Sequence, residues 1–139
     1  MTAITNAEGK IWLALKSRLD DWTETEKMYQ GETFQPNASE PFIIVQDVAL
    51  ETETAAINPD CGESLQGLIN ISVMAPLTWN WAHHKGLCGR LSDFLNASGI
   101  MTYSDAQVRF TQRPRVIGSP RLDEGHNRVE LQCQYRCWG

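Results

Sequence analysis

Two side chains four residues apart are the best candidates in this sequence for reactive chemistry. His84 and Cys88 fall at positions i and i+4 of a predicted helix, so they share one face. That spacing suits two zinc ligands, or a thiol with its base. His83 and Cys61 could serve as further ligands, but neither forms a second pair with ligand spacing. Lone histidines and cysteines on helices are more often packing residues, so we expect no metal, no cofactor and no catalytic residue.

No other segment carries the signature of an enzyme or of a membrane protein. The sequence lacks GxSxG, P-loop, GxGxxG and HExxH motifs, and it has no run of about 18 apolar residues that could span a bilayer. The first ten residues lack the pattern of a secretory signal, so we expect reduced thiols. Cys133 and Cys137 lie about 13 Å apart along a predicted strand, too far for a disulfide. We expect both, like Cys88, to be small core residues.

Charge is distributed unevenly along the 139 residues. Residues 1–66 contain 12 acidic and 4 basic side chains, whereas residues 67–139 contain 5 acidic and 8 basic ones. The net charge of −5 disfavours a protein that binds nucleic acid through a basic patch. Opposite charges on opposite surfaces suit head-to-tail contacts between copies, which close into a ring when the rotation allows. The alternative is a solvated acidic segment that keeps the protein soluble.

Hydrophobic spacing divides the chain into helical and extended segments. Apolar residues recur at helical spacing near the N-terminus and again after Asn80, which can cap the second helix. The last strand is the clearest, because apolar and polar residues alternate along it. In order, the sequence predicts a helix over 4–20, an irregular connection over 23–40, a strand over 41–49, an acidic connection over 50–66, a strand over 68–75, a helix over 80–96, strands over 100–103 and 107–116, a turn at Gly118 and Pro120, and a last strand over 128–137.

These elements predict an α+β fold in a single domain over residues 1–139. We expect a mainly antiparallel sheet of four to five strands, with two helices packed on one face and a long loop between the first two strands. The acidic segment 50–66 is this loop, at the tip of a long hairpin. Gly86 and Gly89 of the second helix are expected to allow close packing on the sheet.

One stretch of sequence is specific enough to suggest a family. Residues 31–37, GETFQPN, contain a Phe-x-Pro step and lead into PFIIV at 41–45. A long loop, a strand over 67–75, a helix and a final alternating strand that ends at Trp138 follow in order. In this segment order the chain resembles the tail terminator proteins of long-tailed bacteriophages and prophages, the group that includes the lambda tail terminator. It departs from that group at 77–81, LTWNW, where the family is usually richer in glycine.

The resemblance implies a structural subunit with no catalytic activity and no cofactor. It implies a hexameric ring on the head-proximal end of the tail tube, which stops tube growth and offers a surface to the head–tail connector protein. DNA would pass through the ring without specific binding, and an acidic or polar lumen suits this, because lysine and arginine would bind phosphate. The implied partners are other copies of the chain, the tail tube protein and the connector protein, with no membrane. The implied location is the virion tail, after assembly in the cytoplasm of the bacterial host.

We expect the functional sites of such a subunit to be assembly surfaces. The acidic segment 50–66 is expected to face the lumen or the tail tube and to become ordered only on assembly. A basic stretch late in the chain is placed to receive acidic groups from the next subunit, with a solvated sheet edge as the alternative. Two tryptophans after the second strand suit an exposed interface. The candidate interface residues are the acidic Glu51, Glu53, Asp60 and Glu63, the basic Arg109, Arg113, Arg115 and Arg121, and the aromatic Trp79 and Trp81.

Three other functions stay open at this point. A small thiol- or zinc-dependent enzyme would use Cys88 with His84, and stoichiometric zinc in the purified protein would favour it. Another phage neck or head-completion protein would share the ring and differ in its partner. A ligand-binding module would line a pocket with some of the five tryptophans, of which we expect Trp12 and Trp22 to lie in the core.

Overall fold

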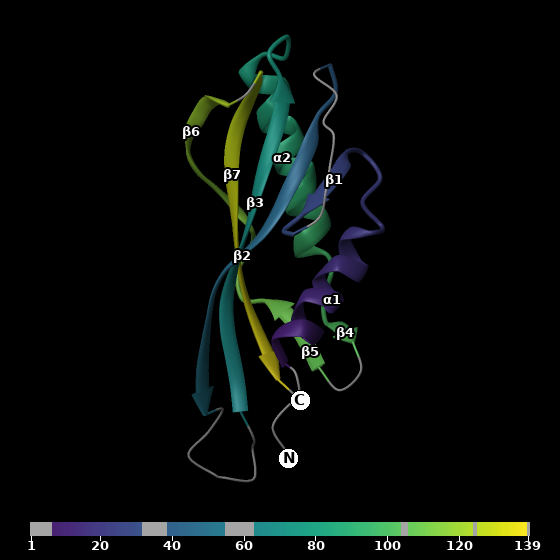
Figure 1. Ribbon diagram of the computed structural model, residues 1–139, viewed down its shortest axis with the longest axis vertical. Helices are drawn as coiled ribbons and strands as arrows, with labels where there is room; N and C mark the ends of the chain where they lie inside the picture. The colour runs from purple at the N-terminus through teal and green to yellow at the C-terminus, as the bar shows by residue number, and fades with distance from the viewer. Residues whose placement is uncertain (1–6, 32–38, 55–62, 104–105, 124, 139) are drawn as a thin grey trace.

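The computed structural model describes residues 7–31, 39–54, 63–103, 106–123 and 125–138, which form two helices and seven strands of a single sheet (Figure 1). The elements are α1 (Ala7–Leu19), β1 (Glu26–Tyr29), β2 (Phe42–Thr54), β3 (Glu63–Pro76), α2 (Trp81–Asn96), β4 (Met101–Tyr103), β5 (Ala106–Phe110), β6 (Arg115–Asp123) and β7 (His126–Trp138).

The sheet has two levels that share the long strands β2, β3 and β7. β3 and β7 pair antiparallel from Ser64 opposite Trp138 to Pro76 opposite His126. At the upper level in Figure 1, β1 pairs parallel with the start of β2, and β6 pairs with the first half of β7. At the lower level, β5 pairs with the end of β7, and β4 pairs with β5. The upper level therefore runs β1-β2-β3-β7-β6, and the lower level runs β2-β3-β7-β5-β4.

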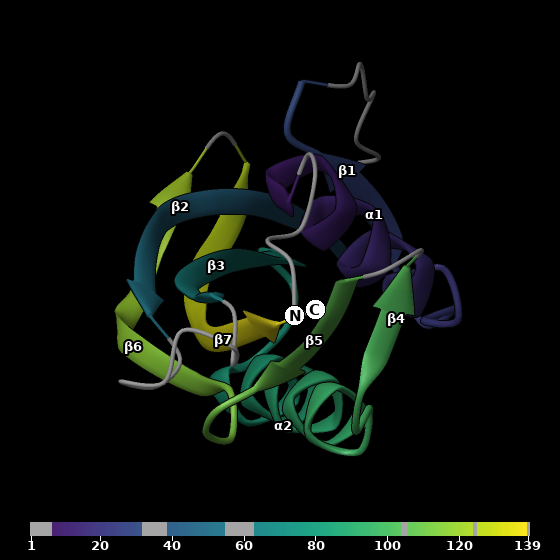
Figure 2. The same cartoon turned by 90° about the horizontal axis from the view of Figure 1, so that it is seen from below.

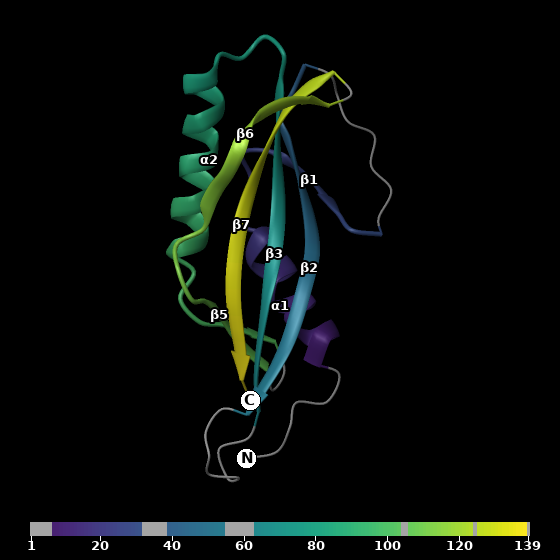
Figure 3. The ribbon, with the colours of Figure 1, turned by 90° about the vertical axis from the view of Figure 1, so that its left-hand side faces the viewer.

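Alternation along the strands places the core on one face of the sheet. Ile71 of β3 lies opposite Val45 of β2 and Leu131 of β7, and all three side chains are buried. Leu15 of α1 and Leu91 of α2 belong to the same core cluster, so both helices cover this inner face. Figure 2 shows that the sheet is curled, and Figure 3 shows α2 running beside it along the strands. The α+β class, with two helices on one face of a mainly antiparallel sheet, is confirmed.

The boundaries of α2 agree with the prediction from local signals. Asn80 is the N-cap, and its side-chain oxygen accepts a hydrogen bond from the His83 amide at 2.8 Å. The expectation of close packing at the helix glycines is wrong. Gly89 is exposed and a Cβ there would meet nothing within 4 Å, while a Cβ at Gly86 would meet the end of Arg90 at 3.5 Å. The glycines therefore do not bring α2 closer to the sheet.

The prediction of an irregular connection over 23–40 is wrong at β1. Residues 26–29 pair parallel with residues 42–45 and bury Tyr29 in the core. Four residues give no readable period, and their partner strand lies farther along the chain. Only the tertiary pairing therefore reveals this strand.

The acidic connection is shorter than the predicted span of 50–66. β2 continues to Thr54 and β3 begins at Glu63, with Thr54 and Glu63 as register partners. Residues 55–62 lie outside the described residues. The predicted long hairpin is present, and much of its acidic segment is paired strand.

The segment between α2 and β7 also differs from its prediction. A single strand was expected over 107–116, but this segment is divided between β5 and β6. In the break between the two strands, the Ser92 hydroxyl of α2 donates a hydrogen bond to the Pro114 carbonyl at 2.5 Å. Gly118 and Pro120 lie inside β6 at a shift of register, rather than in a turn. With β1 and β6 added, the described sheet has seven strands instead of four or five.

Candidate assembly surfaces

His84 and Cys88 share the buried face of α2, as their spacing predicts, but neither is placed to react. Burial lowers the pKa of His84, although the hydrogen bond from its Nε2–H to the Val73 carbonyl, 2.9 Å long, opposes this shift. Burial raises the pKa of Cys88 to about 11 and that of Cys133 to about 12. A thiol with such a pKa stays protonated near neutral pH, so it is a poor nucleophile. Within the described ranges, no three His, Cys, Asp or Glu side chains are grouped to hold a metal ion.

A polar network crosses the outer face of the sheet, which is the face opposite the helices. Glu130 of β7 is at its centre and accepts hydrogen bonds from Ser72 at 2.9 Å, Asn70 at 2.6 Å and Arg128 at 2.6 Å. Arg128 also donates to Asp123 and to the Ser72 hydroxyl, each at 2.8 Å. Partial burial raises the pKa of Glu130, but the donors from Ser72, Arg128 and Asn70 outweigh it and hold the pKa below its ordinary value. The network therefore joins β3, β7 and β6 through charged hydrogen bonds.

The predicted interface arginines separate into two groups. Arg109, Arg115 and Arg121 are exposed and hold register positions on the outer face, opposite even-numbered residues of β7. Arg113 lies between β5 and β6 and forms an ion pair with Asp93 of α2. Arg113 is thus occupied within its own chain, whereas Arg115 has no ion pair with any residue that the structure describes.

The predicted acidic residues lie along the lower half of the β2–β3 hairpin. Glu51 and Glu53 are in β2, and Glu63 begins β3. Asp60 lies outside the described residues. Since β1 pairs only with residues 42–45, the lower part of β2 has β3 as its sole strand partner in the described part of the chain. The acidic residues in β2 therefore belong to an open strand edge.

The two predicted interface tryptophans differ in exposure. Trp79 lies in the turn between β3 and α2 and packs partly buried against the core. Trp81 begins α2 and is 41% exposed, close in sequence to Leu77, which is 54% exposed. This turn is at the top of Figure 1, at the end of the molecule opposite the lower ends of β2 and β3. Of the two tryptophans predicted to be in the core, Trp22 is buried and Trp12 is partly buried against it.

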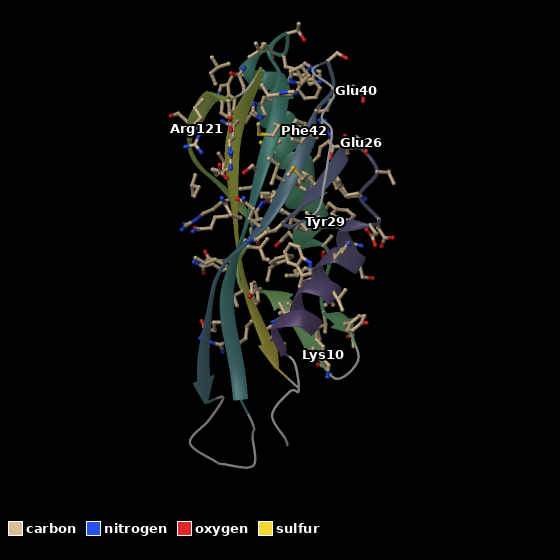
Figure 4. All side chains as sticks on the ribbon, viewed as in Figure 1. Lys10, Glu26, Tyr29, Glu40, Phe42 and Arg121 are labelled. Atoms are coloured by element: carbon tan, nitrogen blue, oxygen red, sulfur yellow. The ribbon has the colours of Figure 1, made fainter. Side chains whose placement is uncertain are left out.

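Sequence reasoning missed two exposed acidic residues beside β1. Glu26 begins β1 and Glu40 precedes β2, and Figure 4 places both on the side of the upper level opposite Arg121. Neither carboxylate forms an ion pair with another residue in the described ranges. The neighbouring Lys27 donates through Nζ to the carbonyl of Leu19 at 3.0 Å, so its ammonium is held at the end of α1. Glu26 fell in the segment predicted to be irregular, which hid its place on a sheet edge.

The described part of the chain combines an α+β fold with exposed charged and aromatic side chains. Its candidate reactive groups are buried, and its charged and aromatic candidates lie at the edges and ends of the sheet. A family model described as phage tail terminator protein matches residues 10–133, so the chain belongs to the phage tail terminator family. This family is structural and non-enzymatic, and its members are tail components of the virion that associate with the tail tube.

The chain was also compared with solved structures and with curated protein sequences. One similar solved structure aligns over 97% of this chain and 98% of its own length, with a TM-score of 0.71 and 18% sequence identity. At that identity the likeness supports the fold alone. No curated protein matches the sequence significantly. Neither described helix is long and apolar enough to cross a membrane.

Proposed function

We propose that copies of this chain form a hexameric ring on the head-proximal end of the tail tube. The ring stops tube growth and joins the tail to the head–tail connector protein, and DNA passes through its hole without specific binding. The observation that carries this proposal is the match of residues 10–133 to the tail terminator family. The resemblance of the segment order to the lambda tail terminator group supports the ring and its two partners.

The two unlike ends of the subunit support a place between two different partners. One end presents the exposed Leu77 and Trp81, and the other carries the acidic hairpin with Glu51 and Glu53. We propose that the hairpin segment 50–66 faces the lumen or the tube and gains protection from hydrogen exchange on assembly, beyond the protection that its paired strands already give. Equal protection of this segment in free chain and assembled ring would count against that orientation.

The proposed function is tested by adding the purified protein to growing tail tubes of its own phage. Tube lengths measured by electron microscopy are expected to stop increasing once about one ring is present per tube end, because a terminator acts only at the growing end. An equal amount of heat-unfolded protein is the control. Tubes that lengthen unchanged would contradict the proposal. Binding to the connector protein without binding to tube ends would identify a neck or head-completion protein instead.

A further inference from the structure

A line of register partners that crosses the upper level of the sheet, from β1 to β6, has an acidic residue at one end and a basic residue at the other. Glu26 lies opposite Phe42, Phe42 opposite Met74, Met74 opposite Arg128, and Arg128 opposite Arg121. Because each step joins register partners, Glu26 and Arg121 are on the same face of the sheet and at the same level along its strands. Figure 4 shows the two residues on opposite sides of the upper level.

Arg121 has unused capacity to bind a second carboxylate. Its side chain is 65% exposed, and it donates through Nη2 to Glu130 at 3.3 Å, which is a long hydrogen bond. Glu130 is already held by closer donors from three other residues. A guanidinium has five N–H donors, so most of those on Arg121 remain available at this edge.

The residues around Arg121 also suit contact with another protein chain better than exposure to solvent. β6 is an edge strand with exposed apolar side chains at Val116 (37%), Ile117 (38%) and Leu122 (70%). Exposed apolar residues on a strand edge favour contact with another chain. Arg115 adds a second exposed positive charge on the same strand.

The opposite edge of the upper level is acidic. Glu26 and Glu40 are both exposed there, and Lys27 is held at the end of α1 by main-chain carbonyls. The charges on the β1 edge therefore complement those on the β6 edge. A chain that carries both surfaces can bind a second copy of itself head to tail.

We propose that neighbouring copies of this chain meet with the β6 edge of one against the β1 edge of the next, and that Arg121 binds Glu26 across the contact. The inference rests on the proposed function, because it names the contact that builds the ring. The two edges occupy the same level along the strands, so each contact rotates the next copy without a large shift along the strand direction. Repetition of such a contact closes a ring when its rotation divides a full turn, whereas an axial shift at each step would give a helix.

The test uses two charge-reversed full-length variants, Arg121→Glu and Glu26→Arg. Each alone places like charges at every contact, so we expect the concentration needed for assembly to rise by at least about tenfold. In an equimolar mixture, each variant's reversed edge meets a complementary edge on the other variant. We therefore expect the mixture to recover the wild-type native mass, measured by light scattering, and wild-type binding to tube ends.

Two control variants distinguish loss of the contact between copies from loss of the folded structure. Lys85→Glu reverses an exposed charge on α2, which is part of neither edge strand, and is expected to assemble like the wild type. Arg121→Gln avoids a new carboxylate beside Glu130 and is expected to weaken assembly less than Arg121→Glu. Recovery in the mixture cannot arise from misfolded chains.

The outcomes distinguish this inference from the function on which it rests. If both reversed variants assemble and bind tube ends like the wild type, or if the mixture fails to recover, the β6–β1 contact is wrong and the proposed function stands. If the wild-type chain neither assembles nor binds tube ends at any concentration, both proposals fail.

Discussion

Glu130 occupies a position where a carboxylate costs stability unless it is paired. Its side chain is 17% exposed, and hydrogen bonds from Ser72, Asn70 and Arg128 compensate its partial burial. All three donors lie on β3 or β7. A single residue thus contributes to the pairing of the two strands that run through both levels of the sheet.

Glu130→Gln is expected to lower the free energy of unfolding by about 2 kcal/mol at pH 7, because it leaves Arg128 without its closest carboxylate. The pKa of Glu130 is lower in the folded protein than its ordinary value of 4.5, so its contribution is present above that value and is lost as pH falls through the folded pKa. Denaturant unfolding of both proteins from pH 7 to pH 3 measures the difference, which should shrink at the acidic end. Gln132→Ala, on the same face of β7, is the control. A difference that stays constant with pH would contradict this role.

At the scale of elements, α2 depends on its N-cap. Asn80→Ala removes the acceptor for the His83 amide and is expected to cost about 1 kcal/mol of unfolding free energy. Asn96→Ala, at the exposed C-terminal end of the same helix, is the matched control and should change stability by less than about 0.5 kcal/mol. Thermal unfolding followed by circular dichroism compares them. Equal losses in both variants would show that the cap does not stabilise the helix.

The elements that sequence reasoning predicted are those with a local signal. The cap at Asn80 and the alternation along β7 are readable within a few residues, and both elements are confirmed. β1 is defined by its pairing with a strand farther along the chain, so no local signal reveals it. β6 pairs with β7, the next strand, but it contains Gly118 and Pro120, which locally favour a turn.

The same distinction applies to the candidate surfaces. The exposure of Arg121 and Trp81 agrees with their predicted surface positions, since charge and aromatic character are visible in the sequence. Glu26 could not be placed on an edge without the pairing of β1 to β2. The partner of Arg113 likewise depends on how α2 packs beside the β5–β6 break.

At the scale of the whole molecule, the end that carries Trp79 and Trp81 has one tryptophan placed to stabilise the fold and one placed to bind a partner. Trp79 stacks on His83 with ring centroids 3.8 Å apart and packs against the core, whereas Trp81 is 41% exposed. Trp79→Ala is therefore expected to lower the free energy of unfolding by about 2 kcal/mol. Trp81→Ala should change it by less than about 1 kcal/mol and weaken binding to the tube or the connector by about tenfold. Unfolding curves and binding titrations on the same samples measure both effects, and unchanged binding by folded Trp81→Ala would remove this end from the interface.

The continuous ladder between β3 and β7 also determines how the subunit carries a mechanical load. The two strands are joined through thirteen register pairs that extend across both levels. A force that pulls the two ends of the molecule apart along these strands loads the hydrogen bonds in parallel, so many must break together. A force across the strands would instead open them one after another from an end. As a component of a phage tail, the subunit is therefore expected to resist extension best along the direction in which β3 and β7 run.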